Sequence, residues 1–96
     1  MKDYEKFSDE ELLTGLHQGQ KELEEYLMDK YKGMVLKKAR AMFLIGGEKE
    51  DLIQEGMIGL FKAVRDYRPQ KNASFSTFAN LCVERQMYKA IEMSAR

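Results

Sequence analysis

The stretch DLIQEGMIGLFKAVR, residues 51–65, decides the fold, because its apolar side chains recur at the spacing of an α-helix. On a helical wheel, one face collects positions at i, i+4, i+7, i+8 and i+11, which is the stripe of a helix packed against a core. This face consists of Leu52, Ile53, Gly56, Gly59, Leu60, Ala63 and Val64. A glycine inside a helix costs about 1 kcal/mol relative to alanine. Two glycines on the buried face therefore predict that another helix approaches closely there.

The opposite face of the same helix carries apolar side chains that a core stripe does not explain. Met57, Ile58 and Phe61 lie on this face. One interpretation is a central helix that is covered on both sides. The other is a partner-binding surface with an apolar centre and a polar rim, as protein interfaces have. We favour the second, because a chain of 96 residues has few elements with which to wrap a helix. The rim would consist of Asp51, Gln54 and Lys62.

The rest of the chain predicts further helices joined by short turns. Four helices are predicted, over residues 8–19, 20–43, 48–67 and 76–94. Ser8 and Glu11 form a capping-box pattern at the start of the first. Gly46-Gly47 ends the second, and the turn 69–72, with the only proline, precedes the fourth. No segment alternates apolar and polar residues over five or more positions, so no strand is predicted. The predicted fold is a compact all-α bundle of about four helices.

The fourth predicted helix also has two different faces. The inner face consists of Phe75, Ala79, Cys82, Val83, Ala90 and Met93. The outer face consists of Phe78, Leu81, Arg85, Tyr88, Lys89 and Glu92, and Arg68 and Lys71 precede it in the turn. Aromatic side chains interleaved with Arg and Lys suit stacking on unpaired bases beside phosphate contacts. From the residues alone, aromatics at a core boundary with solvated charges are an equally good interpretation.

Composition bounds the class of protein. The net charge is zero but uneven, at −6 over 1–29, +5 over 30–45, −2 over 46–64 and +3 over 65–96. Each block by itself is more simply interpreted as a solvated helix face. No apolar run approaches the roughly 20 residues that span a bilayer. The single cysteine, Cys82, cannot form an internal disulfide. We therefore expect a reduced, cytoplasmic setting and no membrane.

Nothing in the sequence indicates catalysis. The only histidine, His17, lies on a polar helix and is interpreted as a surface residue. No Ser-His-Asp or Cys-His set, glycine-rich phosphate loop or metal-ligand spacing is present. We therefore expect no enzyme activity, no cofactor and no metal site.

Three motifs, in order and without gaps, resemble region 2 of the bacterial sigma-70 family of RNA polymerase sigma factors. They are DLIQEGMIGLFKAV (51–64), FSTFA (75–79) and QMYKAI (86–91). In that family they correspond to the polymerase-binding helix, the start of the promoter-melting segment and the segment that reads the −10 element. The resemblance covers roughly residues 8–96. The tracts FLIGG (43–47) and NLCVERQ (80–86) are most similar to the sporulation or stationary-phase sigma-H branch.

The resemblance implies which residues meet which partner. Contacts with the clamp coiled coil of the polymerase β′ subunit are expected at Asp51, Gln54, Glu55, Met57, Ile58 and Phe61. Contacts with the non-template strand of a melted −10 element are expected at Phe75, Phe78, Leu81, Arg85, Gln86, Tyr88 and Lys89. From their charge and position, we expect Arg68 and Lys71 in the turn, together with Lys89, to contact phosphates. The resemblance also leaves open an anti-sigma factor as a further partner.

The sequence departs from the family in three places. Housekeeping members have two adjacent tryptophans where this chain has Leu81 and Cys82, which predicts weaker melting and stricter dependence on promoter sequence. Glu84 stands where a basic residue is usual. Family members continue past the position of Arg96 into a linker and a helix-turn-helix domain for the −35 element, so the chain is expected to be a fragment.

One alternative of a different class stays open. It is a helical interaction module that binds polymerase or a regulator without recognising DNA. The acidic first 29 residues and the zero net charge favour it. The aromatic and basic face of the fourth predicted helix disfavours it.

Overall fold

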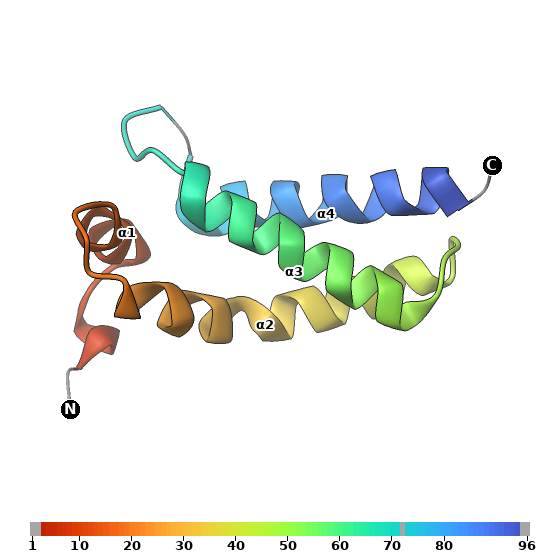
Figure 1. Cartoon of the computed structure of the whole chain (residues 1–96), viewed down its shortest axis with the longest axis horizontal. Helices are drawn as coiled ribbons and strands as arrows, with labels where there is room; N and C mark the ends of the chain where they lie inside the picture. The colour runs from red at the N-terminus through yellow and green to blue at the C-terminus, as the bar shows by residue number, and fades with distance from the viewer. Residues whose placement is uncertain (1–2, 72, 95–96) are drawn as a thin grey trace.

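Helices make up most of the chain in the computed structural model, which describes residues 3–71 and 73–94. The elements are η1 (Tyr4–Lys6), α1 (Asp9–His17), α2 (Glu22–Phe43), α3 (Lys49–Asp66) and α4 (Phe75–Ser94) (Figure 1). No strand occurs in these two ranges. The predicted four-helix, all-α fold is confirmed, and only the short 3₁₀ turn η1 was not predicted. Asn72 of the predicted turn, and Arg96, lie outside the described residues.

Local sequence signals set the helix ends. The Ser8 hydroxyl accepts a hydrogen bond from the Glu11 amide at 3.0 Å, and the Ser8 amide donates to Glu11 Oε1 at 2.9 Å. This confirms the predicted capping box. After α2 the chain turns at Gly47, whose φ of +81° lies in the left-handed region that favours glycine. The predicted stop at Gly46-Gly47 is therefore confirmed.

The close approach predicted from the two glycines occurs where α3 crosses α4 and α2. A Cβ added at Gly59 would lie 2.8 Å from the Cys82 carbonyl oxygen and 3.0 Å from Val83 Cα. A Cβ added at Gly56 would lie 2.7 Å from Val35 Cγ1 and would also meet the end of the Met87 side chain. The two backbones therefore nearly touch at Gly59, whereas side chains fill the space at Gly56.

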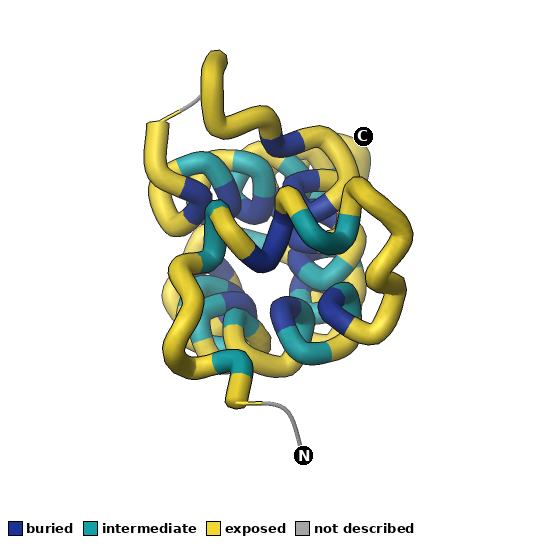
Figure 2. The backbone as a smooth tube through the Cα atoms, turned by 90° about the vertical axis from the view of Figure 1, so that its left-hand side faces the viewer, coloured by how far each residue is buried: buried dark blue, intermediate teal, exposed yellow. Residues whose placement is uncertain are grey.

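The core lies between α2, α3 and α4, with α1 closing one end (Figures 1 and 2). Its buried side chains are Leu12, Leu13, Leu23, Leu27, Val35, Ala39, Met42, Leu52, Leu60, Ala63, Val64, Tyr67, Phe75, Ala79, Val83 and Met87. The α3 stripe is confirmed, with Ile53 at its half-buried edge. No helix within the described ranges has the length and apolar character needed to cross a membrane.

The inner face predicted for α4 is wrong at Met93 and incomplete at Met87. Met93 is 66% exposed, whereas Met87 is fully buried. The buried stripe advances in steps of four residues, from Phe75 through Ala79 and Val83 to Met87, as expected where i±4 ridges pack. Beyond it, Ile91 meets the turn at Gly46, and this contact leaves Met93 outside. Cys82 is half-buried, and burial raises the pKa of its thiol.

Candidate functional site

The outer face of α3 is open to solvent. Ile58 is 43% and Phe61 42% exposed, and Met57 beside them is half-buried. Asp51 and Gln54 are exposed, and Glu55 is partly buried. Although α3 packs on both α2 and α4, its third side remains uncovered, so the interpretation of a fully wrapped helix is wrong. The structure therefore brings all six residues predicted for polymerase contact onto one helix side, or onto its border.

The outer face of α4 is also open, but the predicted residues divide into exposed and buried ones. Leu81 is 44% and Tyr88 48% exposed, and Arg85 and Lys89 are exposed beside them. Phe78 is half-buried, with its ring centroid 5.5 Å from that of Tyr67.

Phe75, in contrast, is fully buried. Its ring packs edge-on against Tyr31 and Tyr67, at centroid distances of 5.3 and 5.4 Å. The structure therefore places Phe75 in the core, where no DNA base can reach it without local opening.

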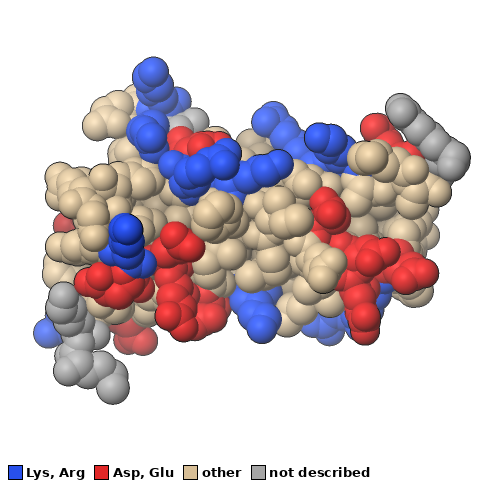
Figure 3. Space-filling view, in the orientation of Figure 1, with Lys and Arg blue, Asp and Glu red and all other residues tan. Residues whose placement is uncertain are grey.

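Basic side chains gather along one edge of the molecule. Figure 3 shows Lys and Arg in blue along the upper edge, over the end of α3, the following turn and α4. The cations in these segments are Lys62, Arg65, Arg68, Lys71, Arg85 and Lys89. Sequence reasoning assigned Lys62 to the rim of the other face and gave Arg65 no role. Arg65 donates two hydrogen bonds to the carboxylate of Asp66, at 2.7 and 2.9 Å, and these lower the pKa of Asp66.

The turn between α3 and α4 is closed at its base. The Tyr67 hydroxyl donates to the Ala73 carbonyl at 2.6 Å, so one hydrogen bond joins the two ends of the turn that carries Arg68 and Lys71. Tyr67 itself is only 1% exposed, and this burial raises its pKa.

Two side chains of α1 bind backbone groups at the helix ends that flank this turn. Glu10 Oε2 accepts a hydrogen bond from the Phe75 amide at 2.8 Å and so caps the start of α4. His17 Nε2 donates to the Val64 carbonyl at 3.0 Å, in the last turn of α3. Backbone amides in the first turn of a helix and carbonyls in the last turn lack a partner within the helix. Glu10 and His17 provide such partners for the Phe75 amide and the Val64 carbonyl. The short helix α1 therefore braces the turn from both sides.

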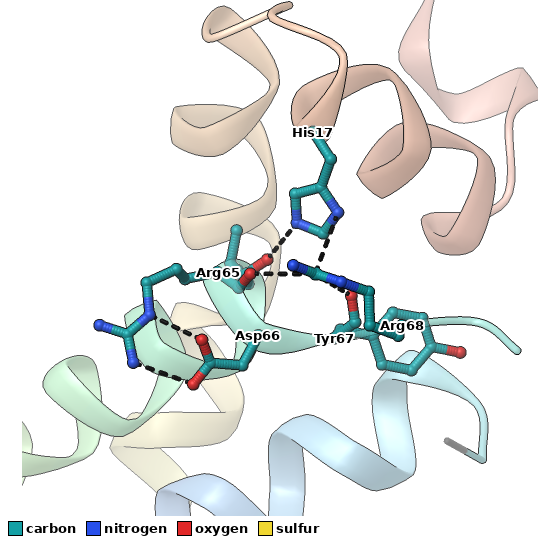
Figure 4. A network of polar contacts seen from close by, with 6 residues as sticks. His17, Arg65, Asp66, Tyr67 and Arg68 are labelled. Carbon is teal, nitrogen blue, oxygen red and sulfur yellow. Dashed lines mark hydrogen bonds and ion pairs between the residues drawn. The ribbon is translucent and has the colours of Figure 1, made fainter. Parts of the chain in front are cut away.

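Arg68 lies between His17 and the end of α3 (Figure 4). Its Nη1 donates to the carbonyls of Tyr67 at 2.8 Å and Arg65 at 3.2 Å, and it lies 3.4 Å from His17 Nδ1. In the tautomer that donates from Nε2 to the Val64 carbonyl, Nδ1 is an acceptor for Arg68. His17 is exposed, as expected, but it is also a tertiary contact that sequence reasoning missed, because its partners lie about 50 residues further along the chain.

Gln86 joins two residues of α3. Its Nε2 donates to Glu55 Oε1 at 2.7 Å, and its Oε1 accepts from Lys62 Nζ at 3.2 Å. Gln86 was predicted to contact DNA and Glu55 to contact polymerase, so the structure brings together residues assigned to different partners.

Glu84, which stands where the family usually has a basic residue, forms an ion pair within the bundle. Its Oε1 accepts from Lys38 Nζ of α2 at 2.6 Å. The acidic residue that departs from the family pattern therefore forms an internal ion pair between α2 and α4.

The described residues thus form a helical domain with one exposed apolar face on α3, which has a polar rim, and a second face of aromatic and basic side chains on α4. No group of His, Cys, Asp and Glu in the described ranges is arranged to hold a metal ion. Residues 27–96 match the family model Sigma-70 region 2, and the chain belongs to that family. The family predicted from the three motifs is thereby confirmed.

Similar proteins point to one branch. The chain is 47% identical over 88 residues to the RNA polymerase sigma-H factor of Bacillus licheniformis. This alignment covers 92% of this chain and 40% of that protein. The chain is 46% identical, with the same coverage, to the RNA polymerase sigma-H factor of Bacillus subtilis. The RNA polymerase sigma-E factor of Clostridium acetobutylicum is 28% identical over 95% of this chain and 39% of its own length. The chain thus spans about 40% of the length of the sigma-H factors that it resembles.

Proposed function

We propose that this domain directs RNA polymerase to promoters, docking on the enzyme through the outer face of α3 and opening the −10 element through the outer face of α4. The observation that carries the proposal is the pair of exposed faces on two adjacent helices whose backbones meet at Gly59. A rigid crossing of this kind holds a polymerase contact and a DNA contact at a constant distance. The proposed setting is the cytoplasm.

The outer face of α3, called the docking face below, has an apolar centre and a polar rim, as protein interfaces have. Phe61 and Ile58 expose large apolar surface at its centre, while Asp51 and Gln54 lie exposed at its rim. Aromatic and aliphatic side chains at the centre of an interface commonly carry most of the binding free energy. The proposed partner surface is the clamp coiled coil of the β′ subunit. An anti-sigma factor would compete with polymerase for this same face.

The outer face of α4, called the DNA face below, has apolar side chains next to basic ones. Taking a base out of the stack costs a few kcal/mol, and stacking on a side chain returns about 1–3 kcal/mol per base. Phe78, half-buried over Tyr67, and Leu81 are the surfaces that would receive such a base. Leucine stacks less well than tryptophan, so melting would depend more strongly on the promoter sequence. Phe75 would act only from the core, through Tyr67, against which the rings of both Phe75 and Phe78 pack.

The charged groups divide into two roles. Lys71 and Lys89 would bind phosphates and so position the domain without reading sequence. Arg85, further along α4, would reach a guanine edge or a phosphate where the DNA is still paired. Arg68 would contribute less than its charge suggests, because its guanidinium already binds the backbone of Arg65 and Tyr67.

The proposal is tested with the full chain assembled on core polymerase. Gln54→Ala combined with Phe61→Ala should keep the helical fold and weaken core binding by about 2 kcal/mol or more. Phe43→Ala is the matched control, because Phe43 is a phenylalanine of similar exposure, 51%, at the end of a different helix, α2. Loss of helicity in the double variant would show that the stripe belongs to the core.

The DNA face is tested on promoters that depend on the −10 element. Phe78→Ala should spare duplex binding but slow open-complex formation, and Arg85→Ala should change the preferred base at the upstream end. Lys71→Ala should weaken binding to every sequence alike and reduce its salt dependence. If Phe78→Ala and Arg85→Ala both transcribe at wild-type rates, the DNA contact is wrong. A module that binds polymerase or a regulator without reading DNA then becomes the better description.

A further inference from the structure

The outer face of α2 carries opposite charges in its two halves. One line of exposed residues along this face consists of Glu25, Asp29, Gly33, Lys37 and Arg40. Successive members are three or four residues apart, so they lie on the same side of the helix. Figure 3 shows the same order over α2, at the lower edge of the molecule, where red side chains are followed by blue ones. The face is therefore acidic in its first half and basic in its second, with a glycine between them.

The charges on this face have no ion-pair partner in the chain. None of its four charged side chains forms an ion pair within residues 3–71 and 73–94. Lys30 and Lys38 of the same helix, in contrast, pair with α1 and α4. Like charges four residues apart destabilise an isolated helix, and Glu25 and Asp29 are so placed. Contacts within the chain therefore leave the separation of the charges unexplained.

Gly33 lies between the two halves with open space above it. No atom lies within 4 Å of a Cβ built there. Its backbone is helical, so the conformation itself does not require glycine. A glycine weakens a helix relative to alanine, and at Gly59 this cost coincides with the close approach of a neighbouring helix. The bare backbone at Gly33 leaves room for a helix of another molecule to approach in the same way.

We propose that the outer face of α2 binds the same face of a second copy of the chain, with the two α2 helices antiparallel and crossing at Gly33. Asp29 and Lys37 lie four residues to either side of Gly33, roughly 6 Å along the helix axis. In the antiparallel pair, Asp29 of each copy therefore stands opposite Lys37 of the other. Glu25 stands near Arg40 in the same way, and two-fold symmetry makes each contact twice. A parallel pair would set like charges against each other.

The expected dimer is weak, because only one helix of each copy takes part. A contact along the helix Glu22–Phe43 is about 33 Å long, and at the width of one helix it buries less than the roughly 1,200 Å² of a standard interface. Leu36, half-buried on the same side as Gly33, gives it an apolar centre. We expect a dissociation constant of roughly 0.1–1 mM at low salt. The pairing uses no residue of the docking face or the DNA face, so it does not depend on the proposed function.

Sedimentation equilibrium of the chain, at concentrations up to roughly 1 mM, tests the proposal directly. The wild-type chain should show a monomer–dimer equilibrium that shifts toward monomer as salt is raised. Lys37→Glu with Arg40→Glu makes the face acidic throughout, and Glu25→Lys with Asp29→Lys makes it basic throughout. Self-association of each double variant should weaken by about tenfold or more, because like charges then meet. An equimolar mixture of the two variants should associate at least as tightly as the wild type.

Two further variants separate the α2 face from net charge and from stability. Lys6→Glu with Lys49→Glu makes the same change in net charge as Lys37→Glu with Arg40→Glu, at exposed positions on η1 and α3. At moderate salt it should leave self-association within about twofold of wild type, because distant charges are screened. Gly33→Leu should abolish the dimer, since the two helices then cannot approach, while its melting temperature stays at or above that of the wild type.

Cross-linking tests the direction of the two helices, in a chain that also carries Cys82→Ser. Gly33→Cys should form a disulfide between two copies under mild oxidation, because this position lies at the crossing. Arg40→Cys should not, because seven residues on either side of the crossing separate the two copies of this position by about 21 Å of helix axis, beyond the reach of a disulfide.

Four results would overturn the proposal. A chain that remains monomeric at roughly 1 mM and low salt has no such dimer. Self-association that the charge reversals leave unchanged uses another surface. Two reversed variants that are folded by circular dichroism but do not associate when mixed lack the complementary faces, and cross-linking that is as fast at position 40 as at position 33 indicates a parallel pair. No assay contains polymerase or promoter DNA, so a failure of the proposed function leaves these results unchanged.

Discussion

The α3–α4 crossing and the attachment of α1 hold one bundle together by different means. At the crossing, Gly59 lets two backbones meet inside the apolar core, and Gln86 adds hydrogen bonds to Glu55 and Lys62 beside it. The helix α1 buries Leu12 and Leu13 and packs Leu16 against the edge of the core, and it adds single polar contacts to the other helices. Segments with few buried apolar contacts open at lower free energy than the core. We therefore expect the crossing to set global stability and α1 to set the order of the turn before α4.

The polar contacts of α1 are concentrated in its first and last turns. Asp9 binds Lys30 at 2.6 Å and also accepts a hydrogen bond from Tyr31, whose pKa is raised by burial and by this bond. Glu10 and His17 bind the backbone of Phe75 and Val64. The attachment of α1 therefore depends on individual polar side chains. The α3–α4 crossing depends instead on Gly59 having no side chain.

The largest effect is expected from Gly59→Leu. The nearest obstacle is the Cys82 carbonyl, a backbone atom that cannot rotate away. Overpacking of this kind costs about 1–3 kcal/mol, even after the gain in helix propensity from replacing glycine. Thermal or urea unfolding monitored by circular dichroism measures the loss.

Gly33→Leu is the matched control for this variant. Gly33 lies in α2 with no atom within 4 Å of an added Cβ, so leucine there should leave stability unchanged or raise it by up to about 1 kcal/mol. If Gly59→Leu melts at or above the wild-type temperature, the close approach is incidental.

The fold and the two faces were predictable because they depend on periodicity. The α3 stripe, its glycines and the exposed Ile58 and Phe61 follow from positions along one helix, which any sequence displays. The burial of Phe75 could be anticipated only in part, because the α4 wheel does not show which aromatic the neighbouring helices cover. Met87 was missed for the same reason, since its burial beside Gly56 is set by the crossing.

The brace and the Gln86 link could not be predicted from one sequence. Glu10 and Phe75 are 65 positions apart, and the accepted group is a backbone amide that carries no sequence signal. Gln86 and Glu55 are 31 positions apart and were assigned by the resemblance to different partners. Side-chain contacts between helices depend on the rotation of each helix, which propensity and spacing leave undetermined.

The second largest effect is expected from Glu10→Ala. The variant removes the cap on the Phe75 amide, and loss of a helix cap costs about 0.5–2 kcal/mol. Hydrogen exchange should quicken at the start of α4 more than at the α3–α4 crossing. Glu25→Ala is the control, because it removes a carboxylate from the first turn of α2 instead. Equal exchange at the start of α4 in both variants would show that α1 does not brace the turn.

Tyr67→Phe tests the base of the turn itself. It keeps the ring packed against Phe75 and Phe78 and removes only the hydrogen bond to Ala73, which should cost about 0.5–1.5 kcal/mol. Tyr88→Phe, at a ring that is 48% exposed, should change stability much less. The difference between the two melting curves measures the bond, and no difference would mean that packing alone closes the turn.

The smallest effect is expected at the ion pair between Lys38 and Glu84. It is as short as the bond from Lys30 to Asp9, at 2.6 Å each, but it joins helices that the core already holds in place. The Glu84 side chain is 39% exposed, so solvent screens the attraction, and pairs of this kind contribute about 0–1 kcal/mol. A double-mutant cycle of Lys38→Met and Glu84→Gln should therefore give a coupling energy below about 1 kcal/mol that falls further in high salt. A coupling of about 2 kcal/mol or more, twice the upper end of that range, would mean that polar contacts also determine stability inside the three-helix core, and the contrast between packing at the crossing and single polar contacts at α1 would no longer hold.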